Sequence, residues 1–161
     1  MRLRVLAFLA IVLTVSAPAN FVFAQDQKSS PNHVHYKESA QTSQASPTGQ
    51  LAPRLQKLGN HVFPVSTKNK QAQLFMNQGL NLTYAFNHAE AGRAYREAAR
   101  LDPDLAMAYW GDALALGPNI NAPMDPNNEP KALEAIQKAV ALKAKASPRE
   151  QALIDALVNR Y

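Results

Sequence analysis

Cysteine is absent from this chain of 161 residues, which excludes disulfides, thiolate zinc sites, iron–sulfur clusters and cysteine nucleophiles. The familiar catalytic motifs are missing as well. The sequence has no G-x-S-x-G elbow, no H-E-x-x-H pair and no glycine-rich loop that would cradle a phosphate. We therefore expect a protein with no catalytic residues, no cofactor and no metal site of its own.

A strong excess of one charge is also missing from the part of the chain that is expected to fold. The formal net charge is +5, but residues 61–161 hold 11 basic and 10 acidic residues. The surplus belongs mostly to the N-terminal region, and no predicted helix face carries a continuous Lys/Arg stripe. Nucleic acid is therefore not an expected partner.

The N-terminus has the parts of a secretory signal peptide. A short basic head precedes the apolar residues 5–15, and small-residue exits follow at Ala19 and Ala24. As a helix, residues 5–15 would rise about 16 Å, roughly half of a bilayer core, which favours a signal peptide over a permanent membrane span. We expect residues 1–24 to direct export, periplasmic or secreted, with cleavage after Ala24 or Ala19. An uncleaved anchor is the alternative.

Residues 25–60 are rich in Gln, Ser, Pro, Asn and Lys, and their few apolar residues are scattered. Such a composition buries too little apolar surface to offset the entropy lost on ordering, which predicts a flexible leader. His33 and His35 lie within it. No cluster of further metal-ligating residues stands beside them, so we interpret them as a solvated pair.

Beyond residue 60 the apolar residues recur every three or four positions, which is typical of amphipathic helices. Asn87 is expected to end the first helix, because asparagine tolerates the left-handed conformation found at helix ends. Ser147 and Glu150 have the spacing of a capping box at the start of the last helix. We expect helices over residues 71–86, 89–101, 104–116 and 130–145, and from residue 147 onward.

A period of about 34 residues predicts the fold. The tetratricopeptide (TPR) pattern asks for an aromatic, a small residue, Ala, an aromatic, Ala and Pro along one helix-turn-helix repeat. The chain supplies them in order as Phe75, Gly79, Ala91, Tyr95, Ala98 and Pro103. The prediction is an all-α solenoid of TPR-like repeats over residues 61–161. It comprises repeat one (about 72–105), repeat two (about 106–146, with an insertion at 117–130) and a further helix (147–161).

The same region resembles the N-terminal part of exported bacterial TPR proteins. The resemblance covers about residues 58–161, and it rests on residues 61–65, 78–80, 85–91, 96–104, 106–111 and 117–121. Members of that family usually continue with further repeats, so the resemblance implies that this chain is the beginning of a longer array. It implies a fold more than a biochemical role, and an open repeat end makes self-association an expected property.

TPR arrays line a concave groove with the first helix of each repeat and bind peptides or partner proteins there. By this resemblance, apolar residues line the groove: Met76, Leu80, Tyr84, Met107, Trp110 and Leu114. Such a surface suits an amphipathic helix or an extended hydrophobic peptide, so the expected function is that of an exported scaffold or protein-binding module. The alternative is that downstream repeats or the protein's own leader cover these residues as ordinary core.

A second hypothesis is a site for a metal or a small ligand, with the chain as part of a larger enzyme. Polar residues on one face of the first helix and in the insertion loop would form its pocket: Asn77, Asn81, His88, Asn119 and Asn121. His61 would join them if the segment around Phe63 folds back. The competing interpretation is that these side chains cap or bond the adjacent backbone.

Overall fold

The computed structural model describes residues 49–161, so the predicted signal peptide and the part of the leader that holds His33 and His35 lie outside the described residues. The described part is helical and has no strand, which confirms the all-α prediction for it. Its five helices are α1 (Lys70–Tyr84), α2 (His88–Leu101), α3 (Ala106–Leu116), α4 (Glu129–Leu142) and α5 (Pro148–Val158), with 3-10 turns η1 (Pro126–Asn128) and η2 (Lys143–Lys145).

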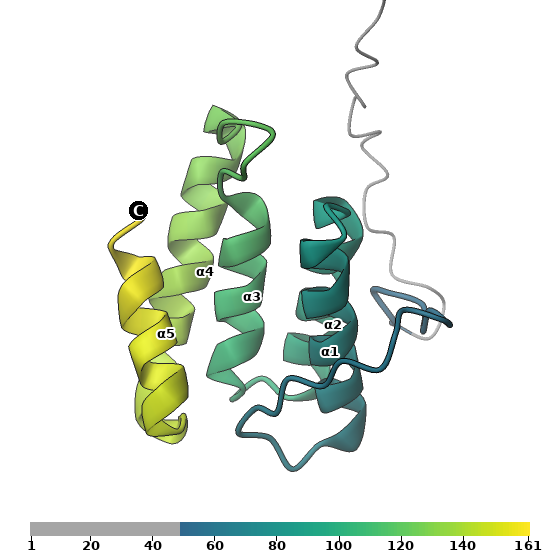
Figure 1. Cartoon of the computed structure of the whole chain (residues 1–161). Coiled ribbons are helices and arrows are strands. Elements are labelled where there is room, and N and C mark those ends of the chain that lie inside the picture. The colour runs from purple at the N-terminus through teal and green to yellow at the C-terminus, as the bar shows by residue number, and fades with distance from the viewer. Residues whose placement is uncertain (1–48) are drawn as a thin grey trace, which may run out of the picture. The chain divides into compact units, whose positions relative to one another are not determined.

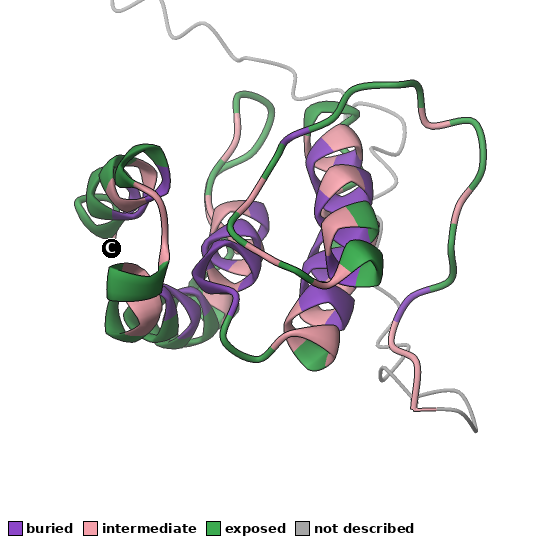
Figure 2. Cartoon of the chain, turned by 90° about the horizontal axis from the view of Figure 1, so that it is seen from below, coloured by how far each residue is buried: buried purple, intermediate pink, exposed green. Residues whose placement is uncertain are grey.

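The helices pack mainly on their neighbours in the chain, and α3 also contacts α1 and α5. Figure 1 shows α1 and α2 as a hairpin on one side of α3, with α4 and α5 on the other. Buried residues gather on the helix sides that face one another, whereas the outer sides of α4 and α5 are exposed (Figure 2). Within residues 49–161 no helix is long and apolar enough to cross a membrane.

Tyr95 of α2 forms the centre of the core and is 0% exposed. Its ring lies against two glycines, Gly79 of α1 and Gly111 of α3. A Cβ on Gly79 would come within 2.6 Å of the ring, and one on Gly111 would come closer still. The missing side chains therefore let three helices meet around one ring. Burial raises the pKa of the Tyr95 phenol, and the hydroxyl lies 3.1 Å from that of Thr83.

The turn from α1 to α2 has its left-handed residue at Phe86, with φ 59°. The prediction that Asn87 takes this conformation was wrong, because the φ of Asn87 is −96°. The Phe86 N–H donates to the Thr83 carbonyl at 3.1 Å, and the Asn87 N–H donates to the Leu82 carbonyl at 2.9 Å. This pair of bonds is a Schellman motif. The motif fixes which position after the helix takes the left-handed conformation, whatever the residue type at that position.

The last helix is fixed at both ends. At its start the predicted capping box is confirmed, because the Glu150 carboxylate accepts from the Ser147 N–H at 2.7 Å and the Ser147 hydroxyl accepts from the Glu150 N–H. Two bonds tie the helix to α3: the Trp110 indole N–H donates to the Leu153 carbonyl at 3.1 Å, and the Tyr161 hydroxyl donates to the Ala113 carbonyl at 2.6 Å.

An extended segment, residues 50–69, lies on the helices, and we call it the strap. In Figure 1 it runs from the side of α1 and α2 toward α3 and α5 and turns back to enter α1. Ala52 is 2% exposed and belongs to the main apolar cluster. Residues 50–60, which were expected to be part of a flexible leader, therefore lie against the helices, and packing begins about ten residues earlier than the predicted boundary.

The second half of the strap alternates in burial. Phe63 is buried and Val65, Thr67 and Asn69 are half-buried, whereas the residues between them are exposed. A period of two is the signature of an extended chain with one side on a surface. Residues 61–69 thus lie on the helices as a strand would lie on a sheet, but their partners are side chains.

Candidate functional site: a face that holds an extended chain

The surface beneath residues 61–67 of the strap is formed by Gln73 and Asn77 of α1, Trp110 of α3, and Arg149 and Glu150 of α5. We call these five residues the strap face. They come from three helices that the sequence separates widely. The packing of α1, α3 and α5 brings them to one side of the molecule.

Gln73 binds the main chain of the strap with both ends of its carboxamide. Its Nε2 donates to the Phe63 carbonyl at 2.8 Å, and its Oε1 accepts from the Val65 N–H at 3.0 Å. Asn77 Oδ1 accepts from the Phe63 N–H at 3.0 Å and from Gln73 Nε2 at 2.9 Å. The two amides thus bond each other and three main-chain groups of the strap.

Gln78 repeats this arrangement nearer the start of the strap. Its Nε2 donates to the Pro53 carbonyl at 2.9 Å, and its Oε1 accepts from the Leu55 N–H at 3.0 Å. In both cases one carboxamide joins the C=O of a residue to the N–H two positions later. A residue in a parallel β-ladder makes the same pair of bonds, so each glutamine acts as a one-residue strand.

The Phe63 ring is the apolar anchor of the strap. It stacks on the Trp110 ring with centroids 6.3 Å apart and planes inclined by 19°. The Arg149 guanidinium also lies over the Phe63 ring, 5.1 Å from the ring centroid. A ring that contacts both an indole and a guanidinium gains dispersion and cation–π energy in addition to burial.

Glu150 binds the strap just after this anchor. Its Oε1 accepts from the Ser66 N–H at 2.7 Å, and its other oxygen accepts from the Ser66 hydroxyl. Burial by itself would raise the pKa of Glu150, but the hydrogen bonds from Ser66 and Ser147 outweigh it and hold the pKa below its usual range. The carboxylate that caps α5 therefore also holds the strap.

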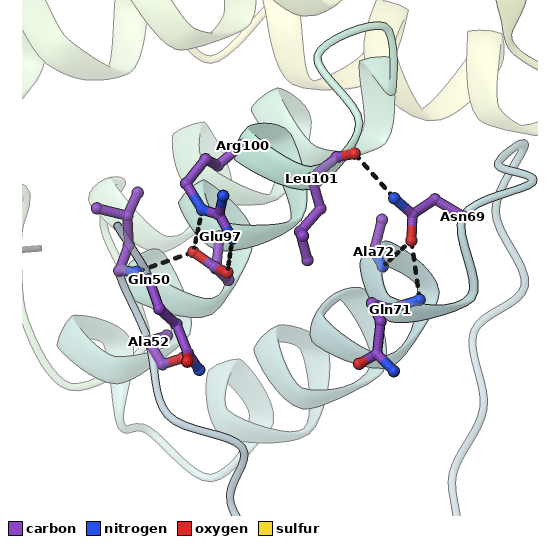
Figure 3. Close-up of polar contacts among 9 residues, drawn as sticks. Gln50, Ala52, Asn69, Gln71, Ala72, Glu97, Arg100 and Leu101 are labelled. Carbon is purple, nitrogen blue, oxygen red and sulfur yellow. Dashed lines mark hydrogen bonds and ion pairs between the residues drawn. The ribbon is translucent and has the colours of Figure 1, made fainter. Parts of the chain in front are cut away.

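Glu97 of α2 performs the same task where the strap begins. It is 1% exposed, and it accepts from the Leu51 N–H at 2.8 Å and from two nitrogens of Arg100 at 2.9 and 2.6 Å. Burial would raise its pKa, but these bonds outweigh that effect and lower it. Figure 3 shows this carboxylate between Arg100 and the strap, together with Asn69, whose amide donates to the Leu101 carbonyl at 2.8 Å.

The loop between the two halves of the strap, residues 57–60, is exposed except at Leu58, which packs against the core. Lys57 and Gly59 both have left-handed conformations, with φ 62° and 85°. Beneath the loop lies a hollow of about 380 Å³, which is lined by residues 54–62 and by α1. Residues 57–60 thus join two anchored segments through two left-handed positions, with Leu58 between them packed against the core.

The predicted groove residues are mostly inside the protein. Met76, Leu80, Met107 and Trp110 are between 0% and 8% exposed and belong to the same apolar cluster as Phe63 and Ala52 of the strap. Leu114 is half-buried, whereas Tyr84 is 78% exposed. The expected open apolar surface is therefore covered in this conformation, and the protein's own extended segment contributes to the cover.

The predicted polar pocket is divided. Asn77, Asn81 and His61 line the hollow beneath the strap loop. His88 does not line it, and in the loop after α3 the Asn121 N–H donates to the Asn119 side chain at 2.9 Å. Both ring nitrogens of His88 are buried and have no partner among the described residues. Burial also lowers its pKa.

A second hollow, of about 810 Å³, lies between α2 and α4 over α3. Two ion pairs lie in its lining, Arg96 with Asp112 at 2.7 Å and Lys138 with Glu134 at 2.8 Å. Burial raises the pKa of Asp112, and Arg96 offsets part of the rise. This hollow differs from the strap face because these two ion pairs join side chains to each other, whereas the strap face bonds a main chain.

Comparison of the chain with protein-family models, with curated proteins and with solved structures finds no match. The functional argument therefore depends on the geometry of the chain itself. Sequence reasoning placed Trp110 in a binding surface and Asn77 in a polar pocket, but it missed Gln73, Gln78, Arg149 and Glu150 as contacts of the strap. The alternation of Phe63 and Val65 was the available signal for an extended segment.

Proposed function

We propose that this chain is an exported, non-catalytic scaffold of the TPR type that binds an extended segment of a protein partner in the concave groove where the strap lies. One observation carries the proposal. The strap face bonds the main-chain groups of Phe63 and Val65 and seats the Phe63 ring. Main-chain bonds for affinity and a side-chain pocket for specificity are what recognition of an extended peptide requires.

The assignment to the TPR class is supported by the core. Residues at the positions that the pattern reserves for close packing are buried, namely Phe75, Gly79, Ala91, Tyr95 and Ala98. Tyr95 packs on Gly79, which is the contact between an aromatic and a small residue that the TPR pattern predicts. Export remains part of the proposal through the predicted signal peptide.

This function is tested by displaying the full chain and selecting, from a library of short random peptides, those that bind to it. Phe63→Ala vacates the ring pocket, so peptides should be enriched on this variant. Adding Gln73→Ala removes the contact with the main chain, so these peptides should no longer bind. Adding Leu74→Ala, the control on the same helix, should leave their binding unchanged. If Phe63→Ala keeps its helical circular dichroism and yields no Gln73-dependent peptide, the function is wrong.

Metal or small-ligand binding through His61, His88 and the Asn-rich loop is the alternative function. It is favoured by the two unpartnered ring nitrogens of His88. No group of three His, Cys, Asp or Glu that could hold a metal occurs within residues 49–161, which favours the peptide-binding proposal. Elemental analysis of the purified chain and of His88→Ala separates the two: a bound metal that is lost in the variant would favour the alternative.

A further inference from the structure

The strap occupies the strap face, so its own chemistry indicates what the site accepts. Four main-chain groups of the strap are bonded by side chains of the face: the N–H and C=O of residue 63 and the N–H groups of residues 65 and 66. The main-chain nitrogen of residue 64 is not among them, and that residue is proline. Within residues 63–66, the one position whose main-chain nitrogen the face does not bond is filled by proline, which has no N–H.

Proline also prepares the segment for binding. It restricts the preceding residue to extended conformations, which are those that the bonds of Gln73 require. A segment that is already extended loses less conformational entropy when it binds. Pro64 itself is exposed, so its contribution is to the conformation of the chain and not to burial.

Three side chains of the strap meet specific partners. Position 63 places an aromatic ring in contact with Trp110 and Arg149. Position 65 places a half-buried aliphatic side chain against the core. Position 66 places a hydroxyl that donates to Glu150 and accepts from the Ser147 N–H at 3.2 Å. The site therefore favours an aromatic group at position 63, an aliphatic group at position 65 and a hydroxyl group at position 66.

The second half of the strap is also placed to detach on its own. Every other residue from 62 to 68 is exposed, and the loop before it contains the left-handed Lys57 and Gly59. The first half keeps separate anchors, Ala52 in the core and the bonds to Gln78 and Glu97. Residues 61–67 therefore have a hinge and independent contacts, which are the features of a locally opening segment.

We propose, building on the peptide-binding function above, that the partner segment is an extended sequence of the form aromatic–Pro–aliphatic–Ser/Thr. Residues 63–66 of the strap are its internal competitor. The strap keeps the site closed until such a segment replaces it. Because a tethered competitor acts at an effective concentration of the order of millimolar, the partner binds weakly to the closed protein and tightly once the strap is released.

Trp110 is the only tryptophan of the chain, so its fluorescence reports directly on the site. The experiment titrates the full chain carrying Phe63→Ala with a blocked peptide that has the sequence of residues 61–68. Matched peptides replace its phenylalanine or its proline by alanine. Val62→Ala is the control protein, because Val62 is 57% exposed and its loss leaves the strap in place.

We expect saturable binding of the unchanged peptide to Phe63→Ala and weaker binding to Val62→Ala. Loss of the phenylalanine should weaken binding at least about tenfold, as burial of one aromatic side chain implies. Loss of the proline should weaken it about two- to fivefold. Equal binding of the three peptides would overturn the sequence preference but not the peptide-binding function. The same conclusion would follow if peptides from the random selection bind while these three peptides do not. Absence of binding by all peptides would overturn both.

A second measurement needs no opened variant. Since the chain has no cysteine, Val65→Cys introduces a single thiol whose rate of labelling reports release of the strap. Millimolar unchanged peptide should raise this rate several-fold, and the peptide without phenylalanine should not. An unchanged rate with the unchanged peptide would show that the strap is a permanent part of the core and would overturn the competition.

Discussion

The helices and the strap are held by different kinds of contact. The helices meet through small residues around a buried ring, as Tyr95 packs on Gly79 and Gly111. The strap is held by carboxamide and carboxylate side chains that bond its main chain, and by one ring, that of Phe63. The helical contacts depend on shape, whereas the strap contacts depend mainly on an extended backbone.

The two kinds of contact predict two separable levels of stability within one chain. Close packing in the helical core is cooperative, so a change at Tyr95 should be felt throughout. Main-chain bonds at the surface are individually modest and open locally. In the proposed function, a surface that holds its own backbone in this way also accepts another backbone. The following changes separate the two levels.

Gly111→Ala should have the largest effect, on the helices. Its Cβ would overlap the Tyr95 ring, and overpacking of this kind costs about 3 kcal/mol. Thermal or urea unfolding followed by circular dichroism measures it. Gly92→Ala is the control, because only the ends of the Arg96 and Asp112 side chains come within 3.4 Å of its Cβ. Equal stability of the two variants would contradict the account of the core.

Phe63→Ala should have the next effect, on the strap. Loss of the buried ring removes about 2 to 3 kcal/mol from the closure of residues 61–67. The helices should remain folded, so the far-ultraviolet circular dichroism should change little while the Trp110 emission moves to longer wavelength. Loss of the helical signal together with the emission shift would mean that strap and helices form one unit.

Glu150→Gln should weaken the strap and the start of α5 by about 1 to 2 kcal/mol, because bonds to a charged acceptor are lost. The lowered pKa of Glu150 fixes the pH dependence. Its contribution is complete above the unfolded value of about 4.3 and is lost as the pH falls through the lower pKa of the folded state. Unfolding measured from pH 7 to pH 3 should show a larger loss of stability in the parent chain than in the variant, because Glu97, whose pKa is also lowered, contributes a loss to both. Glu134→Gln, which removes an exposed carboxylate paired with Lys138, should lose nearly as much stability as the parent chain over this range.

Phe86→Gly should stabilise the helices by about 0.5 kcal/mol. Glycine takes the left-handed conformation of residue 86 without steric cost, although it loses more entropy on folding than phenylalanine. Ala85→Gly is the matched control, since residue 85 has φ −85° and should lose stability on this change. Destabilisation of both variants to the same extent would contradict the assignment of the turn.

Tyr84→Ala should have the smallest effect. Tyr84 was predicted to line the groove, but it is 78% exposed, so its loss should change stability by less than about 0.5 kcal/mol. Peptide binding to Phe63→Ala should also remain the same when Tyr84→Ala is added. A marked loss of peptide affinity would extend the site beyond the strap face.

The helices were predictable because their signals are local. The three- and four-residue spacing located all five, and the capping box at Ser147 fixed the start of α5 to the residue. The end of α4 at Leu142 was missed, because the chain tightens there into a 3-10 turn without a proline or glycine to mark it. The left-handed conformation of Phe86 was not predicted, because the Schellman hydrogen bonds depend on position relative to the helix end and not on residue type.

The site was harder to predict because its contacts are long-range and polar. Nothing in the spacing of Gln73 and Gln78 shows that they bond a main chain that comes before the helix. The composition of residues 50–60 predicted flexibility, since bonds from side chains to the backbone do not appear in an apolar count. Phe63 and Val65 carried the only periodic signal, and two residues are too few to define a strand.

Hydrogen exchange of individual amides, measured by NMR on the unaltered chain, tests the separation of strap and helices most directly. The amides of Phe63, Val65 and Ser66 should exchange through an opening that costs less free energy and depends less on urea than the opening that exposes Tyr95 and Gly111. Addition of the peptide with the sequence of residues 61–68 should change the exchange of the strap amides alone. Exchange of the strap amides at the same free energy as the core amides, with no response to the peptide, would contradict the account.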